Sequence, residues 1–389
     1  MMRLLTAGNI DVRGKKVLLR ADLNVSFDAK GNIADDFRVR ALWPTIKYLR
    51  ERDAAVLIFS HLGRPEGKRD PRFTLAPIAK RLEQLLETPV RFVNDCIGSE
   101  AQTAAKEAGP GSVTVLENLR FHAGEEENDP AFAEQLAELG DVVVNDAFGA
   151  SHRPHASIAW LPKLRPSVAG LLLQKEVEAL TKLRDNPTRP LAIILGGAKI
   201  SNKLPLIERL LPKADALCLG GALANTVLKA KGLAVGKSLV EEEMVERVKP
   251  LALTDTHLHL PVDVVVSRDR TGTLPVEVHG AADVRGDELI LDIGPDTIVL
   301  FENIIRGSKT VFWNGPLGLA EVPAFADGTK KVARALATTF LSSVVGGGDL
   351  TVILDQLGLI EKFGFVSTGG GAMLEFLAGM ELPGISALS

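Results

Sequence analysis

Two lysines that follow a pair of glycines are the residues of this chain best placed to do chemistry. The segment Leu191–Lys203 reads LAIILGGAKISNK: five apolar residues, then Gly196 and Gly197, then Lys199 and Lys203. Five consecutive apolar residues are typical of a buried parallel strand, and glycine lets the backbone approach a ligand closely. If the following segment is helical, a spacing of four stacks the two ammonium groups on one face. The stretch therefore predicts a phosphate site, with two solvated surface lysines as the alternative.

Glycines recur at three further strand ends in the second half of the chain, at 220–221, 346–348 and 369–371. The last two clusters, GGGD and TGGG, run straight into predicted helices, where backbone N–H groups bind phosphate. One such cluster indicates only a tight turn, but four at one sheet edge favour nucleotide phosphates. Asp349, which ends GGGD, is a candidate Mg²⁺ ligand, with a helix N-cap as the alternative.

The first half of the chain instead collects cations at its predicted strand ends. Guanidinium forks suit phosphate and carboxylate oxygens, although a single strand-end arginine is more often part of a surface ion pair. Several arginines beside polar side chains predict a small anion with hydroxyl groups, bound through charge and through Asp22 and Asn24. The cations are Arg38, His61, Arg64, Arg120 and Arg153, with His152 and His155 nearby.

Strands alternate with helices along the whole chain, which predicts parallel βαβ units and an α/β fold. Strands are expected at 16–20, 54–60, 112–116, 141–144, 191–195, 216–219, 258–260, 262–266, 309–313, 342–345 and 365–367. Helices are expected at 38–50, 75–86, 132–139, 170–184, 204–211, 222–231, 241–253, 328–338, 351–357 and 372–377, and the segment 201–209 already favours helix. We expect two doubly wound parallel-sheet (Rossmann-like) domains, at 1–169 and 185–378, joined by a hinge helix at 170–184.

Composition excludes several classes of protein. With 389 residues the chain is too long for one core, and its 46% hydrophobic and 24% charged residues are ordinary for a soluble globular protein. A net charge of −4 provides no general attraction for nucleic acid or an anionic membrane. No apolar run suits a membrane span and no signal peptide is apparent, and two distant cysteines, Cys96 and Cys218, fit a reducing cytoplasm.

Two other motifs carry no function here. The segment 232–238 (GLAVGKS) resembles a phosphate-binding P-loop, but only three residues separate its glycines where four are required. His257 and His259 alternate on a predicted strand without further metal ligands, so we interpret them as structural. Neither a dinucleotide-binding G-x-G-x-x-G nor a Ser-His-Asp arrangement is present.

Eight motifs in order resemble the phosphoglycerate kinase family. They cover essentially the whole chain: RADLNVS (20–26), SHLGRP (60–65), ENLRFHAGEEEND (117–129), NDAFGASHRPHAS (145–157), LGGAKISNK (195–203), WNGPLGLAE (313–321), GGGD (346–349) and STGGGA (367–372). Each motif is weak alone, whereas the ordered set is highly specific. The resemblance implies reversible phosphoryl transfer from 1,3-bisphosphoglycerate to ADP, giving 3-phosphoglycerate and ATP, with Mg²⁺, in a cytoplasmic, monomeric, hinge-bending enzyme of glycolysis and gluconeogenesis. It also implies that the tail 379–389 returns to the N-terminal domain.

The resemblance also implies which residues form the site. The triose would be bound by Asp22, Leu23, Asn24, Arg38, His61, Leu62, Gly63, Arg64, Arg120 and Arg153. The nucleotide would be bound by Gly196, Gly197, Lys203, Gly220, Gly221, Gly294, Asn314, Pro316, Glu321 (on the ribose), Gly347, Gly348, Asp349 (also the metal ligand) and Leu350. Arg38, Lys199, Gly348 and Gly371 would stabilise the migrating phosphoryl group.

The chain departs from the family pattern at three positions and leaves two alternatives open. Ser26 stands where proline is usual, Ala320 where phenylalanine is usual, and Leu350 where threonine or serine is usual. One alternative is another ATP-dependent kinase acting on a carboxylate, which the 61–64 and 117–120 motifs disfavour. The other is a catalytically silent scaffold, which the presence of Lys199 and Asp349 disfavours.

Overall fold

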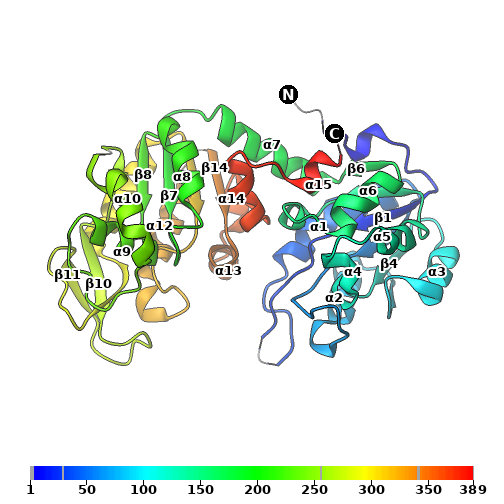
Figure 1. Ribbon diagram of the computed structural model, residues 1–389, viewed down its shortest axis with the longest axis horizontal. Coiled ribbons are helices and arrows are strands. Elements are labelled where there is room, and N and C mark those ends of the chain that lie inside the picture. The colour runs from blue at the N-terminus through cyan, green and yellow to red at the C-terminus, as the bar shows by residue number, and fades with distance from the viewer. Residues whose placement is uncertain (1–3, 29, 255, 340–341, 389) are drawn as a thin grey trace. The chain divides into compact units, whose positions relative to one another are not determined.

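The chain forms two compact units. The computed structural model describes residues 4–28, 30–254, 256–339 and 342–388. One unit comprises Met1–Glu178, Gly371–Phe376 and Met380–Ser389, and the other comprises Ala179–Gly370 and Leu377–Gly379. The division falls inside helix α7 (Leu171–Asp185), so this helix contributes to both units (Figure 1).

The first unit is built on a parallel sheet whose described strands have the order β3-β4-β2-β1-β5-β6. Alternate residues of β1 face opposite sides: Val17 and Leu19 belong to a core that includes residues of α1 and α2, whereas Leu18 belongs to a core that includes residues of α3 and α5. The strands are β1 (Lys16–Arg20), β2 (Ala55–Phe59), β3 (Val90–Val93), β4 (Val113–Leu116), β5 (Val142–Asn145) and β6 (Ser167–Ala169). The helices are α1 (Phe37–Arg50), α2 (Ala76–Leu86), α3 (Gly98–Glu107), α4 (Ala123–Glu126), α5 (Pro130–Ala137), α6 (Leu161–Leu164) and, from the end of the chain, α15 (Pro383–Ser386).

The second unit repeats this plan. Its described strands form a parallel sheet in the order β15-β14-β13-β7-β8-β9 and a small antiparallel sheet in the order β11-β10-β12 (Figure 1). The strands are β7 (Leu191–Leu195), β8 (Ala216–Leu219), β9 (Leu258–His259), β10 (Asp263–Ser267), β11 (Glu277–Gly280), β12 (Leu289–Ile293), β13 (Thr310–Asn314), β14 (Ser342–Gly346) and β15 (Phe365–Ser367). The helices are α8 (Leu204–Leu210), α9 (Gly221–Ala230), α10 (Glu242–Thr254), α11 (Pro295–Gly307), α12 (Asp327–Thr338) and α13 (Gly348–Gln356). Helix α14 (Gly371–Leu377) belongs to the first unit except for its last residue.

Each parallel sheet reverses its order of strands at its first strand. In the first unit β2 lies on one side of β1 and β5 on the other; in the second, β8 lies on one side of β7 and β13 on the other. In open parallel sheets, ligands bind at such a reversal, beyond the carboxyl ends of the strands. The fold thus points to one candidate site in each unit.

The predicted fold class, two doubly wound parallel-sheet α/β domains, is confirmed. The third strand of the first half, β3, and helix α3 were not predicted, nor were β11, β12 and α11. The predicted helical segment 201–209 is wrong at its beginning, because α8 starts only at Leu204.

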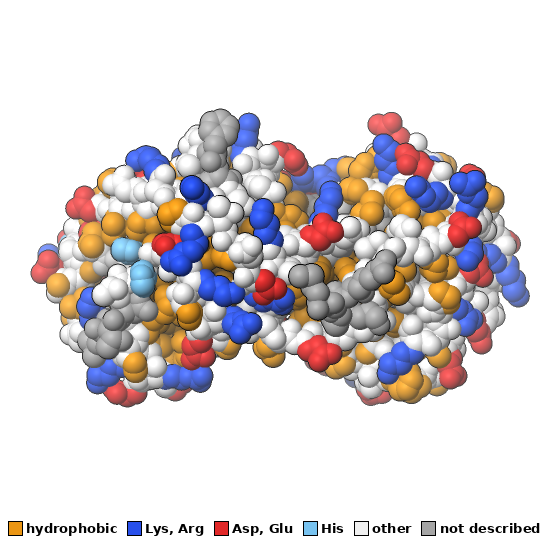
Figure 2. Space-filling view, turned by 90° about the horizontal axis from the view of Figure 1, so that it is seen from above, with side chains coloured by type: hydrophobic (Ala, Val, Ile, Leu, Met, Phe, Trp, Pro, Cys, Tyr) orange, Lys and Arg blue, Asp and Glu red, His pale blue; other side chains and the backbone are white. Residues whose placement is uncertain are grey.

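Charged side chains of both signs are interspersed over the face of the molecule shown in Figure 2, as the net charge of −4 leads one to expect. Among the described residues, no helix has the length and apolar character that crossing a membrane requires.

Candidate active site

Direct contacts join the predicted polar residues at the carboxyl edge of the first sheet. The guanidinium Nη1 of Arg38 donates to the backbone oxygen of Asn24 at 2.6 Å and lies 3.5 Å from Oδ1 of Asp22. The side-chain oxygen of Asn24 accepts from the Gly63 N–H at 2.9 Å, and Arg120 Nη1 donates to the Gly63 carbonyl at 2.7 Å. The segments that follow β1, β2 and β4 therefore meet in one polar cluster, as the sequence predicted.

Two more arginines and a neutral histidine lie near this cluster. Burial, together with the charges of Arg20 and Arg120, holds the pKa of His61 well below its usual value, so the imidazole is neutral. The pKa of Arg120 is lowered chiefly by burial, and Arg153 and Arg64 lie close enough to lower it further. Such a concentration of guanidinium groups favours an anion at this edge of the sheet.

Two of the predicted binding residues contribute through their backbone. Leu23 is completely buried and its N–H donates to Ser60 Oγ at 2.9 Å. Leu62 is also buried, and its N–H donates to the side-chain oxygen of Asn118 at 3.2 Å. Both leucines belong to the core that supports the cluster.

Asn118 is a supporting residue that the sequence analysis did not single out. Its side chain is completely buried; its amide nitrogen donates to the backbone oxygens of Leu62 at 2.8 Å and Phe73 at 2.9 Å. Its carbonyl oxygen accepts from the N–H of Arg120 at 3.0 Å. Asn118 thus fixes the loops that carry His61 and Arg120, and its position directly after a strand was the available signal.

Glu125 is a second supporting residue. It lies in a run of three glutamates, and its carboxylate is completely buried, which the sequence does not indicate. It accepts from Ser157 N at 2.9 Å and from Ser157 Oγ at 2.6 Å, and it lies 3.9 Å from Arg20 Nη2. This network anchors the segment that follows His155.

In the second unit, glycines allow three segments to pack closely at the edge of the sheet. The Gly197 N–H donates to the Pro316 carbonyl at 2.7 Å. A Cβ added at Gly196 would lie 2.0 Å from that same oxygen, and one at Gly221 would lie 2.7 Å from the nitrogen of Gly197. Gly220 is restricted in the same way by Leu317, at 2.7 Å. These contacts require glycine whether or not a ligand binds, so the role of these glycines in nucleotide binding stays a prediction.

The two lysines of the opening motif differ in their surroundings. Lys199 is exposed and lies before α8, whereas Lys203 is buried at the start of that helix. The Lys203 ammonium donates to the Gly196 carbonyl, and burial lowers its pKa to about 8, partly offset by the charge of Asp349. The prediction that both ammonium groups stack on one helix face is therefore wrong.

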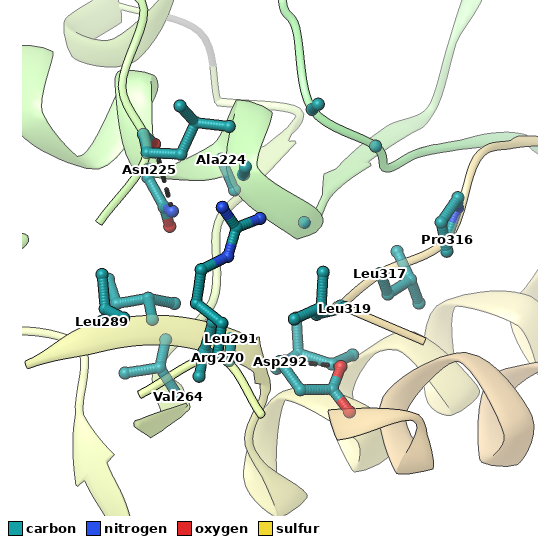
Figure 3. Close-up of a pocket in the computed structure, with 18 of the residues that line it drawn as sticks. Ala224, Asn225, Val264, Arg270, Leu289, Leu291, Asp292, Pro316, Leu317 and Leu319 are labelled. Atoms are coloured by element: carbon teal, nitrogen blue, oxygen red, sulfur yellow. Dashed lines mark hydrogen bonds between the residues drawn. The ribbon is translucent and has the colours of Figure 1, made fainter. Parts of the chain in front are cut away.

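A cavity of about 420 Å³ opens beside these glycines (Figure 3). Its size is typical of a site for a small ligand. Five predicted nucleotide-binding residues line it: Gly197, Gly221, Pro316, Glu321 and Asp349. The sequence analysis missed its largely apolar walls, which are formed by Ala224, Leu239, Val264, Leu289, Leu291, Leu317 and Leu319.

Other predicted nucleotide-binding residues support the walls of this cavity without lining it. Asn314 is buried and donates through Nδ2 to the Gly346 carbonyl at 2.8 Å, which ties the ends of β13 and β14 together. A Cβ on Gly294 would lie 2.3 Å from the carboxylate of Asp263, and Leu350 is completely buried in α13. Gly347 precedes α13 and Gly348 begins it. Gly371, predicted to stabilise the phosphoryl group, begins α14 in the first unit.

Asp349 does not cap its helix. The N-cap of α13 is Gly347 and makes no side-chain capping bond, while Asp349 lies in the first turn with an exposed carboxylate. This carboxylate lines the 420 Å³ cavity and a neighbouring one of about 610 Å³. Because Mg²⁺ in nucleotide sites takes one or two carboxylates plus phosphate oxygens, Asp349 fits a metal held jointly with a nucleotide.

Asp292, in the same cavity wall, makes the stability of the second unit depend on pH. Its carboxylate accepts from the N–H groups of Gly328 at 2.8 Å and Ile293 at 2.9 Å, and burial raises its pKa to about 7. Because its pKa is higher in the folded state, the Asp292 carboxyl binds its proton more tightly there than in the unfolded chain. It therefore stabilises the fold most at pH below the unfolded pKa of about 3.9, and this stabilisation is lost as pH rises through the folded pKa.

We therefore expect the melting temperature of the wild type to fall, relative to that of Asp292→Asn, as pH rises from about 5 to about 8. Circular dichroism melts of both proteins at several pH values measure this difference. Asp146, whose pKa burial raises to about 6, adds the same trend to both proteins and cancels. A constant difference at every pH would contradict the assignment.

Comparison with known proteins agrees with the geometry of both sheet edges. The family model described as phosphoglycerate kinase matches residues 7–380. A phosphoglycerate kinase of Moorella thermoacetica is 47% identical over 392 residues, covering 100% of both chains. The structure of phosphoglycerate kinase from Coxiella burnetii has a TM-score of 0.84 and 40% identity, covering 99% of each chain. That of the Pyrococcus horikoshii enzyme has a TM-score of 0.89 and 32% identity, covering 99% of this chain and 98% of the other. The chain belongs to the phosphoglycerate kinase family.

Proposed function

We propose that the two sheet edges are the half-sites of one phosphoryl transfer, the first for the triose and the second for the nucleotide. The chain is a phosphotransferase of glycolysis: it transfers a phosphoryl group reversibly from 1,3-bisphosphoglycerate to ADP, giving 3-phosphoglycerate and ATP. The assignment of the triose to one edge and the nucleotide to the other rests on the contrast between the two edges. One is a cluster of guanidinium groups, and the other is a glycine-bordered, apolar-walled cavity of about 420 Å³.

In the first half-site, the arginines bind the anionic groups of the triose. Arg38, Arg64, Arg120 and Arg153 supply forked donors that match phosphate and carboxylate oxygens. Asp22 and Asn24 lie in contact with Arg38 and accept from, or donate to, the hydroxyl group. The neutral His61 donates a hydrogen bond without adding a titrating charge.

In the second half-site, the apolar walls hold the base and polar groups hold the rest of the nucleotide. Glu321 binds the ribose hydroxyls, and backbone N–H groups near Gly197 and at the start of α13 face the phosphates. Lys203 contributes a buried positive charge. Asp349 holds Mg²⁺, which, when bound, neutralises charge on the terminal phosphates.

The transfer itself requires charge stabilisation and no general base. The accepting carboxylate of 3-phosphoglycerate is ionised near neutral pH, since such groups have pKa values of about 3–4. The phosphoryl group carries charge on its oxygens in the transition state, and Arg38, Lys199 and the N–H groups at Gly348 and Gly371 stabilise that charge. Because water competes as an acceptor, transfer should proceed only when both half-sites are filled and brought together, with α7 as the hinge.

The proposal also covers the compartment and the oligomeric state of the enzyme. We infer a cytoplasmic monomer. Support comes from Cys96 and Cys218, which are both buried free thiols, so they fit a reducing compartment.

An assay with 3-phosphoglycerate, ATP and Mg²⁺ tests the proposal directly. Production of ADP that depends on 3-phosphoglycerate supports it. A kinase acting on a different carboxylate would form ADP only with another acceptor, and a scaffold would form none, so a panel of small carboxylates separates both alternatives.

Replacing Arg120 with alanine should mainly raise the KM for 3-phosphoglycerate. Arg120 is the buried guanidinium that contacts Gly63 in the triose half-site, and loss of one charge-assisted contact costs about 1.5–3 kcal/mol, or roughly 10- to 150-fold. Steady-state kinetics with each substrate varied in turn measures the effect. Arg91→Ala, an exposed arginine paired with Glu107, is the control. A change in KM for ATP alone would contradict the assignment.

A further inference from the structure

The loop that carries Lys199 is anchored on both sides of this lysine. Before it, the Gly197 carbonyl accepts from the N–H of Leu223, in the first turn of α9, at 3.0 Å. After it, Ser201 donates to the carboxylate of Glu241 through N at 3.0 Å and through Oγ at 2.5 Å. Two fixed points four residues apart thus bracket a lysine whose own side chain is exposed.

Glu241 is a buried carboxylate that has no part in the proposed chemistry. It is 9% exposed. Although burial works to raise the pKa of its carboxyl, the hydrogen bonds from Ser201 and from the Ile200 N–H, together with the charge of Lys199, hold this pKa below its ordinary value. The group is therefore ionised at neutral pH, and hydrogen bonds to an ionised acceptor are stronger than those to a neutral one. The turn after Lys199 is accordingly held by strong bonds to one side chain.

Glu241 is itself fixed to helix α9. Its backbone N–H donates at 3.1 Å to Oγ1 of Thr226, which is completely buried in that helix. The next residue, Glu242, begins α10 and pairs with Lys229 of α9 at 2.6 Å. Helix α9 begins at Gly221, at the sheet edge where the nucleotide phosphates are expected. One helix therefore supports both the phosphate edge and the carboxylate that holds the loop.

The contact with Glu241 opposes the local preference of the loop. Residues 201–203 favour helix, yet they form turns, and α8 begins only at Leu204. Extending α8 back through this turn would move the chain just before it, and with it Lys199. A displacement of about 1 Å can lower the rate of a reaction about 100-fold. We propose that Glu241 is a positioning residue, which holds Lys199 where the phosphoryl group is transferred. The inference rests on the proposed role of Lys199.

Steady-state kinetics of the full chain tests this inference. Glu241→Ala removes both acceptor oxygens, so it should lower kcat about 10- to 100-fold. The KM values for ADP and for 1,3-bisphosphoglycerate should change by less than about twofold, because Glu241 holds a group used in the transition state. Glu241→Gln keeps one acceptor oxygen for the turn and should regain part of the lost kcat. Ser201→Ala removes one donor from the other side of the contact and should lower kcat in the same direction.

Glu242→Ala is the matched control. Glu242 is the neighbouring carboxylate, but it is exposed and pairs with Lys229 rather than with the loop. Its replacement should leave kcat and both KM values within about twofold of the wild type. Circular dichroism melts of every variant verify that the assays are made on folded protein.

The same substitution in a Lys199→Ala background decides whether Glu241 acts through this lysine. If it does, Glu241→Ala should lower kcat by less than about twofold once Lys199 is absent, because the two residues then act as one unit. A purely structural carboxylate would lower kcat by the same factor in both backgrounds.

That equal loss, or a kcat of Glu241→Ala within twofold of the wild type, would overturn the inference while leaving the proposed function standing. A wild-type kcat in Lys199→Ala alone would instead overturn the catalytic role of Lys199 in the proposed function.

Discussion

Replacing Lys199 with alanine should lower kcat by roughly 100- to 1,000-fold, the range expected when one preorganised charge is removed from a transition state. Lys199 is exposed two residues after Gly197, and it makes no hydrogen bond or ion pair within the described part of the chain. Its ammonium group is therefore free to contact the migrating phosphoryl group. Its charge adds to the lowered pKa of Glu241 only after the hydrogen bonds from Ser201 and Ile200, so its loss should change the melting temperature little.

The design of this experiment separates catalysis from binding. Single-turnover rates and Kd for ADP are measured on Lys199→Ala and on Lys249→Ala, an exposed lysine paired with Glu246 that lies outside both half-sites. The account expects a large loss of rate in the first variant only, with Kd for ADP nearly unchanged, since a group used only in the transition state adds little to ground-state affinity. A kcat within twofold of the wild type would remove Lys199 from the catalytic group.

Replacing Asp349 with asparagine should raise the concentration of Mg²⁺ required for nucleotide binding by at least about tenfold, since even outer-shell partners of metal ligands contribute about 10–100-fold to metal affinity. The exposed carboxylate of Asp349 lies in the first turn of α13, where it makes no capping bond, and it lines the nucleotide cavity. Its loss also removes the negative charge that partly offsets the lowered pKa of Lys203.

Titration of the protein with ADP at a series of Mg²⁺ concentrations measures this effect without relying on activity. Asp287→Asn, at an exposed carboxylate paired with Arg268, is the control. If Asp349→Asn bound ADP with the same dependence on Mg²⁺ as the wild type, Asp349 would not be the metal ligand and its place in the cavity wall would need another explanation.

The strands that were predicted with their observed bounds are dominated by apolar residues. Leu191–Leu195 is completely buried and was predicted with its observed bounds. Strand β3 was missed because only Val90 and Val93 of its four residues are buried, so too few apolar positions mark it. The helix predicted at 204–211 begins where α8 begins, but residues 201–203, which also favour helix locally, are not helical. In the structure Ser201 instead donates to Glu241, through N at 3.0 Å and Oγ at 2.5 Å, and a contact forty residues away overrides local preference.

The polar part of the candidate site could be predicted, and the apolar part could not. Asp22, Arg120 and Asp349 stand within four residues of the carboxyl ends of strands, where few structural reasons exist for such side chains, so their positions carry information. Leucines such as Leu289 and Leu291 are the commonest core residues, and nothing in the sequence separates those facing the cavity from those facing the core.

Separate titrations of 3-phosphoglycerate and of ADP with Mg²⁺ into Arg120→Ala and Asp349→Asn test the central claim most directly. The account predicts that Arg120→Ala weakens 3-phosphoglycerate by about tenfold or more and leaves ADP within about twofold, and that Asp349→Asn does the reverse. If either variant weakened both ligands equally, or if the two effects were exchanged, the assignment of the triose to the arginine-rich edge and of the nucleotide to the glycine-bordered cavity would be contradicted.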